Sequence, residues 1–154
     1  MYIIEDSRQQ KNKHELKHRC FEEAGTYMVR CKLPVGDYCL PPAVSVDTKQ
    51  GIEEIAQNIG GKKDEHERFI NELKLARDMG TMLYILVENE DGIESVDDLE
   101  RWVNPRTEYS PRCIQGDRLA KAMRTIEGRY GCVFLFCRPD EAADTIIDLL
   151  RVSK

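Results

Sequence analysis

The sequence predicts an α/β fold in which a mixed central sheet is flanked by helices on both faces. Short apolar stretches typical of strands alternate along the chain with segments whose apolar residues recur at helical spacing. Two six-residue runs, 82–87 and 132–137, are too apolar to alternate and predict central strands covered on both faces. With 154 residues, 41% of them hydrophobic, the chain suits a single domain over 1–154.

Each predicted element follows from local periodicity and from the residues that end it. Gly25 and Gly80 end two amphipathic helices. In the predicted strand at 43–49, Val44 and Val46 point one way and polar residues the other, which predicts one core face and one polar face. In chain order, the elements are a strand at 2–5, a helix at 9–24, strands at 26–33 and 43–49 with a turn at 34–36 between them, helices at 52–59 and 64–79, a strand at 82–87, helices at 95–103 and 117–127, a strand at 132–137 and a helix at 140–151.

Composition and charge exclude several classes of protein. The net charge of -5 argues against a protein that simply coats nucleic acid. No apolar run approaches the roughly 20 residues of a membrane span, and the N-terminus lacks the build of a signal peptide, so we expect a cytoplasmic protein without membrane contact. The negative charge is concentrated at 88–100, whereas 101–130 is basic. We expect the acidic segment to face away from a nucleic-acid substrate.

The cysteines and the first two histidines predict no chemistry of their own. The six cysteines include no C-x-x-C pair and no zinc-finger spacing, which favours buried thiols in a reducing compartment. His14 and His18 lie four residues apart among charged neighbours, which favours a solvated helix face.

The residues that indicate chemistry are Asp37, just after a tight turn, and Asp47 and Lys49 on the next strand. Asp47 and Lys49, two residues apart on a strand, point the same way, and a hairpin can bring Asp37 alongside Asp47. Two adjacent carboxylates repel unless a divalent cation lies between them, and Mg²⁺ or Mn²⁺ suits such oxygen ligands. Lys49 would orient or help deprotonate an attacking water. This pattern is typical of metal-dependent phosphodiesterases, although it also occurs by chance in α/β proteins.

Further motifs surround this constellation in a fixed order. They are IIEDSR with Asp6 and Arg8, LPVGDY with Asp37, VDTK with Asp47 and Lys49, LYILVE ending at Glu88, and the C-terminal LFCRPDEAADTIIDLL. In this combination the chain resembles, from end to end, the ERCC4-type nuclease domain of the XPF/Mus81 endonucleases. That family lies within the PD-(D/E)xK restriction-endonuclease-like superfamily. The resemblance implies a restriction-endonuclease-like fold and a metal-dependent DNA endonuclease.

The resemblance also implies roles for individual residues. Asp6, Asp37 and Asp47 would be the acidic metal ligands and Lys49 the catalytic lysine. Arg8 would contact the scissile phosphate or orient the carboxylates. The candidate accessory residues are a peripheral acidic residue, Glu53, and two DNA or active-site contacts, His66 and Arg68.

Structural roles remain open for several of these residues. Asp6 is also consistent with a helix cap. Arg8 would equally suit a surface ion pair, and Glu53 the first turn of a helix. A charged outer helix face would explain His66 and Arg68.

Three positions depart from the family pattern. They are Asp47 in place of Glu, Thr48 in place of Arg, and Gln9 in place of Glu. These departures leave open an altered metal preference or a weakened enzyme.

We therefore predict a Mg²⁺-dependent endonuclease that acts on branched or structured DNA in recombination, repair or phage DNA processing. The alternative is a catalytically weak or inactive relative that binds nucleic acid or a partner protein. The large eukaryotic relatives carry helix-hairpin-helix modules, and the chain shows none after the nuclease motifs. We therefore expect a microbial or phage-encoded protein that forms a homodimer or works beside a separate DNA-binding subunit. No glycine-rich phosphate loop supports a small-molecule enzyme.

Overall fold

The computed structural model describes residues 2–10, 13–40 and 44–151. Residues 11–12 of the predicted helix at 9–24, and residue 43 of the predicted strand at 43–49, lie outside the described residues. In chain order the elements are β1 (Tyr2–Asp6), α1 (Glu15–Glu23), β2 (Tyr27–Cys31), β3 (Tyr38–Leu40), β4 (Val44–Lys49), α2 (Ile52–Gly60), α3 (Lys63–Asp78), β5 (Met82–Glu88), the short 3-10 helices η1 (Asp98–Arg101) and η2 (Pro105–Glu108), α4 (Gly116–Tyr130), β6 (Val133–Cys137) and α5 (Ala142–Arg151).

The strands form one mixed sheet of six strands in the order β2-β1-β3-β4-β5-β6. Three pairs of neighbouring strands are parallel, namely β1 with β2, β4 with β5, and β5 with β6. The short strand β3 lies between β1 and β4 and runs antiparallel to both. The chain therefore enters the middle of the sheet through β3, and the turn that leads into β3 lies at one end of β1 and β4.

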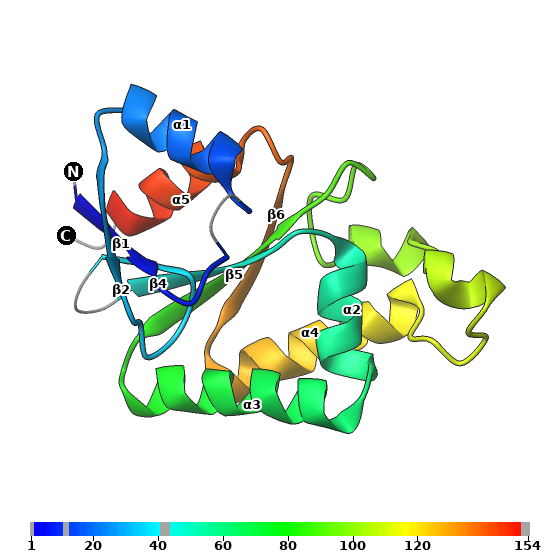
Figure 1. Cartoon of the computed structure of the whole chain (residues 1–154). Helices are drawn as coiled ribbons and strands as arrows, with labels where there is room; N and C mark the ends of the chain where they lie inside the picture. The colour runs from blue at the N-terminus through cyan, green and yellow to red at the C-terminus, as the bar shows by residue number, and fades with distance from the viewer. Residues whose placement is uncertain (1, 11–12, 41–43, 152–154) are drawn as a thin grey trace.

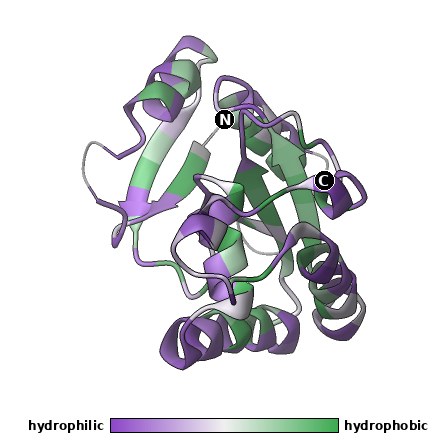
Figure 2. Ribbon diagram, turned by 90° about the vertical axis from the view of Figure 1, so that its right-hand side faces the viewer, coloured by the Kyte–Doolittle hydropathy of each residue, from purple (hydrophilic) through white to green (hydrophobic). Residues whose placement is uncertain are grey.

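Helices cover both faces of this sheet (Figure 1). On one face α1 and α5 lie together, and Phe21 and Ile146 pack there with Leu86 of β5. On the other face α2, α3 and α4 pack around a second cluster that includes Ile55 and Leu73. In Figure 2 the central strands are coloured hydrophobic, and the helices around them carry hydrophilic residues along part of each turn. The architecture confirms the predicted fold class.

Backbone hydrogen bonds tie the turn that leads into β3 to β1 and β4. The amide N of Asp37 donates to the carbonyl oxygen of Val46 at 2.9 Å, and the amide N of Asp6 donates to the carbonyl oxygen of Asp37 at 2.7 Å. Gly36, just before, has φ of 74°, a left-handed conformation that favours glycine. The turn therefore places the backbone of Asp37 between the ends of β1 and β4.

Two predicted strands occupy different environments from those expected. All six residues of β4 are buried, so its predicted polar face is not solvated. The reason is that β4 lies between β3 and β5 and is covered by helices on both sides. The run at 132–137 is the edge strand β6 rather than a central one. Its apolar composition reflects packing on both faces, because Phe134 joins one core cluster and Leu135 packs against the other.

The helix predictions also need two corrections. The predicted acidic helix at 95–103 forms only the single 3-10 turn η1, in which Leu99 is the buried residue. The prediction of a solvated helix face with His14 and His18 is wrong. His14, just before α1, is buried, and His18 in α1 bonds the buried carboxylate of Glu5 at 2.7 Å. The α1 helix also contains the buried Lys17, whose ammonium pairs with the Glu88 carboxylate of β5. None of the described helices is long and apolar enough to cross a membrane.

Candidate active site

Asp37 lies at the turn into β3, and its side chain is held by three hydrogen bonds. Its Oδ2 accepts from the amide N of Thr48 at 3.0 Å and from the Thr48 hydroxyl at 2.8 Å. Its Oδ1 accepts from the side-chain amide of Gln9. The predicted juxtaposition of Asp37 with the end of β4 is therefore present in the structure.

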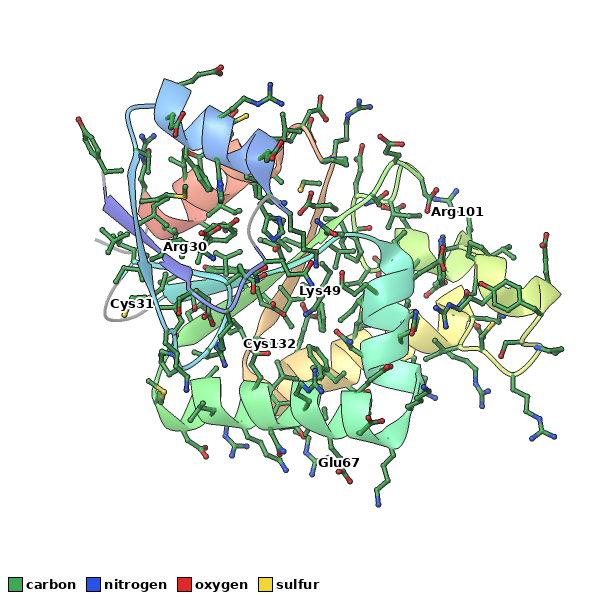
Figure 3. The ribbon with its side chains drawn as sticks, in the orientation of Figure 1. Arg30, Cys31, Lys49, Glu67, Arg101 and Cys132 are labelled. Atoms are coloured by element: carbon green, nitrogen blue, oxygen red, sulfur yellow. The ribbon has the colours of Figure 1, made fainter. Side chains whose placement is uncertain are left out.

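Asp47 and Lys49 share one side of β4, as their spacing predicts, and they form an ion pair. Lys49 Nζ lies 2.7 Å from Asp47 Oδ2, and both side chains are buried. Lys49 also lies 5.8 Å from the centre of the Phe69 ring of α3. Figure 3 shows Lys49 in the middle of the molecule, beside α2.

Burial dominates the electrostatics of this pair. It raises the pKa of the Asp47 carboxyl, Asp37 adds to the effect, and the Lys49 ammonium opposes it. Burial alone would lower the pKa of Lys49, but the charge and hydrogen bond of Asp47 outweigh it and raise that pKa. Lys49 is therefore protonated, and Asp47 is a carboxyl whose ionised form needs a nearby cation.

Asp6 and Arg8, at the end of β1, form a close pair at the same site. Arg8 Nε donates to Asp6 Oδ2 at 2.8 Å, and the Arg8 Nη2 also donates to the carbonyl oxygen of Leu33 at 2.8 Å. Burial works to raise the pKa of Asp6, but the hydrogen bonds and charge of Arg8 outweigh it and lower that pKa. Asp6 is therefore ionised, with both carboxylate oxygens occupied by Arg8.

A cavity of about 400 Å³ joins these groups at one end of the sheet. Its lining includes Asp6, Arg8, Asp37, Asp47, Arg68 and Glu72. Lys49 faces an adjoining cavity of about 190 Å³, which shares Arg68 and Glu72 with the first. The structure thus brings Asp6, Arg8, Asp37, Asp47 and the accessory Arg68 to one hollow, with Lys49 in the cavity that adjoins it.

Glu72 on α3 is a carboxylate that the sequence motifs did not indicate. Its Oε1 accepts from the amide N of Gly36 at 2.7 Å, so it ties α3 to the turn that carries Asp37. Arg68 lies one helical turn earlier and has no hydrogen bond or ion pair in the described structure. The i, i+4 spacing of Arg68 and Glu72 is the one signal by which the pair could have been found.

The other two accessory predictions lie away from this hollow. Glu53, exposed on α2, forms an ion pair with Arg106 at 3.7 Å. The His66 Nδ1 bonds the carbonyl oxygen of Asn58 at 3.2 Å, which attaches α3 to α2. Any part they play in the site remains a prediction.

A larger cavity of about 730 Å³ continues from Arg68 toward Trp102. Its wall includes Glu53, Glu88 and Asp91. The first residues of the acidic segment 88–100 therefore border the site rather than lying remote from it. Both cavities have carboxylates in their walls, and the first also has the exposed cations Arg8 and Lys13.

The donor set around Asp37 and Asp47 fits a hard divalent cation. Among residues 2–10, 13–40 and 44–151, no three His, Cys, Asp or Glu side chains form a group that could hold a metal. Asp37 and Asp47 supply two carboxylates, and Mg²⁺ commonly binds through one or two carboxylates together with waters and phosphate oxygens. Burial keeps the pKa of Asp47 raised even beside Lys49, so a divalent cation would further favour its ionised form.

Comparison with known proteins identifies the fold. Neither the protein-family models nor the curated proteins give a sequence match to this chain. Among solved structures, XPF from Aeropyrum pernix matches with a TM-score of 0.68 and 19% identity, over 100% of this chain and 62% of that one. The same protein in complex with DNA matches with a TM-score of 0.70 and 20% identity, over 99% of this chain and 64% of that one.

The chain therefore has an α/β fold of the XPF nuclease type. The expected resemblance is confirmed at the level of the fold, since the match extends over the whole chain. The chain spans less than two thirds of the length of the XPF chains it matches.

Proposed function

We propose that the chain is a metal-dependent endonuclease that hydrolyses phosphodiester bonds in DNA. The observation that carries the proposal is the gathering of Asp37, Asp47 and Lys49 at one end of the β3–β4 hairpin, beside an open cavity. The neighbouring XPF structure determined with DNA supports DNA as the substrate class. We propose branched or structured DNA as the substrate, in line with the hypothesis from the sequence.

Asp37 and Asp47 would hold a divalent cation, with Mg²⁺ or Mn²⁺ as the expected metal. When bound, such a cation lowers the pKa of a water and neutralises charge on a phosphate oxygen. Hydrolysis then consists of attack by water on phosphorus and cleavage of one phosphoester bond.

The remaining residues orient the substrate and balance its charge. Lys49, protonated beside Asp47, stabilises the negative charge that develops on the phosphoryl oxygens. Arg68, which lies at the junction of the cavities and has no hydrogen bond or ion pair with any described residue, would bind a phosphate. Arg8 retains an exposed guanidinium edge, although Asp6 and Leu33 occupy part of its donors.

The proposal is tested by incubating the protein with duplex, single-stranded, flap, fork and four-way-junction DNA. Each substrate is tested with Mg²⁺, with Mn²⁺ and with a chelator. We expect internal cleavage of at least one substrate in the presence of metal and none with the chelator. Cleavage that persists with the chelator would refute metal dependence. Binding without cleavage under every condition would instead support the non-catalytic alternative.

A further inference from the structure

A hydrogen-bond chain reaches the candidate site from α1, and no sequence motif predicted it. His14, just before α1, bonds Gln9 Oε1 through its Nε2 at 2.9 Å. Gln9 Nε2 in turn donates to Asp37 Oδ1. His14 is 4% exposed, so the hydrogen-bond chain begins in the protein interior rather than at the surface.

The donor and acceptor of each bond in this hydrogen-bond chain follow from the chemistry of Asp37 and His14. Asp37 is a carboxylate and can only accept, so Gln9 must present its amide NH₂ group to Asp37 and its oxygen to His14. His14 must therefore donate from Nε2. Burial, aided by Lys17, lowers the pKa of His14 to about 4, so the ring is neutral at neutral pH and carries its single proton on Nε2.

The hydrogen bonds to Asp37 also distinguish its two oxygens. Oδ2 accepts two hydrogen bonds from Thr48, which use both of its lone pairs. Oδ1 accepts one bond, from Gln9, and keeps one lone pair. The carboxylate is thus fixed on both sides, and Oδ1 is the atom left for a ligand.

We propose that Gln9, held by His14, is a positioning residue that orients Asp37 so that Oδ1 binds the divalent cation. This inference rests on the proposed function, because it assigns a partner to a residue of the same site. Hydrogen-bonded neighbours of metal ligands commonly contribute about 10- to 100-fold to metal affinity. Gln9 would supply this support without adding a charge to the site.

The first experiment measures Mn²⁺ affinity by calorimetry in the full chain and in single and double variants. Gln9→Leu removes both bonds of Gln9 at similar size, and we expect about 10- to 100-fold weaker Mn²⁺ binding. His14→Phe should weaken binding less, and His14→Gln, which keeps an amide donor, should restore it. Because the residues act in series, adding His14→Phe to Gln9→Leu should cause no further loss.

The matched control is His18→Phe, the same substitution one turn later in α1. His18 bonds Glu5, which does not line the site cavity, so Mn²⁺ affinity should equal that of the wild type. Thermal melts of every variant separate a loss of metal affinity from a loss of folding. The inference would be overturned if Gln9→Leu bound Mn²⁺ with wild-type affinity. It would also be overturned if His14→Phe reduced Mn²⁺ affinity equally in the wild type and in Gln9→Leu.

A second experiment detects the hydrogen-bond chain without metal. In ¹H–¹⁵N spectra of the full chain, the Gln9 side-chain amide should be displaced from the free-amide position. It should move in His14→Phe and stay in place in His18→Phe. A free-amide position in the wild type would overturn the inference. If this signature is present while the wild type binds no Mn²⁺, the hydrogen-bond chain stands and the proposed function, with the cation role of Gln9, fails.

Discussion

Asp47 is the residue whose behaviour depends most on its surroundings. On an exposed strand it would be an ordinary ionised carboxylate, whereas here it is buried beside Asp37 and paired with Lys49. Its raised pKa means that the carboxyl keeps its proton to a higher pH than an exposed aspartate does. A cation that binds the ionised form must therefore displace a proton.

This property predicts pH-dependent metal binding. Because Mn²⁺ binds ionised Asp47, its affinity should rise with pH above the ordinary aspartate pKa of about 4, until Asp47 is fully ionised. Calorimetry at several pH values, in buffers of different ionisation enthalpy, should detect about one proton released per Mn²⁺ bound. An affinity that does not change with pH, with no proton released, would contradict the assignment of Asp47 as a ligand.

The sequence identified the acidic residues of this site but not the groups that hold them. Asp37, Asp47 and Lys49 could be predicted because their spacing on a hairpin and a strand is local. His14, Gln9 and their bond to Asp37 could not, because the contact of Gln9 with Asp37 spans 28 residues and depends on the sheet topology.

The turn that leads into β3 is the element that positions the site, and Gly36 is its critical residue. A Cβ at Gly36 would lie 2.5 Å from Ser45 Oγ and 3.2 Å from the carbonyl oxygen of Val46, in addition to the left-handed φ. Gly36→Ala should therefore lower the free energy of unfolding by about 2–5 kcal/mol, measured by urea denaturation.

Gly80 provides a matched control for this prediction. It has a φ of 66° at the end of α3, but a Cβ there would have no atom within 4 Å. Gly80→Ala should cost only about 1–2 kcal/mol, from the left-handed backbone alone. Equal losses at the two glycines would show that the contact with Ser45 contributes nothing.

The buried ion pair of Lys17 and Glu88 links α1 to β5. Both side chains are nearly inaccessible, so removal of one partner leaves an uncompensated buried charge. We expect Lys17→Met to lower the free energy of unfolding by about 3–5 kcal/mol, measured by urea denaturation. The double variant Lys17→Met with Glu88→Leu should recover most of the loss, since no buried charge then remains.

The exposed pair of Lys63 and Glu67 on α3 is the control for the buried pair. These side chains lie 3.6 Å apart and are 89% and 60% exposed, so Lys63→Met should change stability by less than about 0.5 kcal/mol. Losses of the same size for Lys17→Met and Lys63→Met would contradict the view that α1 is held through a buried charge.

The type of an element could be predicted where hydrophobic periodicity is strong. The prediction failed where tertiary contacts determine the local structure. The long amphipathic helices at 63–78 and 116–130 and the apolar strand at 82–88 lie close to their predicted positions. The predicted helix at 95–103 shortened to η1, because the backbone of Trp102 is extended, with φ of -72° and ψ of 130°, and ends the helical turn there. Leu99 and Trp102 are nevertheless both buried in the core.

At the scale of the molecule, charge is distributed unevenly around the candidate site. The site cavity has the cations Arg8, Lys13 and Arg68 beside its carboxylates, whereas in the larger cavity Arg68 lies among acidic residues of α2, α3 and the segment after β5. We expect DNA phosphates to approach along the cationic side. The net charge of -5 thus argues against a nonspecific coat but is compatible with one DNA-binding face.

This arrangement predicts the salt dependence of DNA binding. Lys13→Gln and Arg68→Gln should each reduce the slope of log affinity against log salt concentration by about one, through loss of one phosphate contact. Lys74→Gln, an exposed substitution on α3 outside both cavities, should leave the slope unchanged. Fluorescence anisotropy with a chelator present measures all three. Equal slopes in wild type and all variants would contradict the proposed face.

The central claim is that Asp47 and Lys49 form the catalytic centre of a metal-dependent nuclease. The most direct test measures cleavage and binding of one DNA substrate by wild type, Asp47→Asn and Lys49→Met in Mn²⁺, with thermal melts to verify folding. We predict that both variants cleave at least about 100-fold more slowly while binding DNA within a few-fold of wild type. Cleavage at the wild-type rate by either folded variant would contradict the claim.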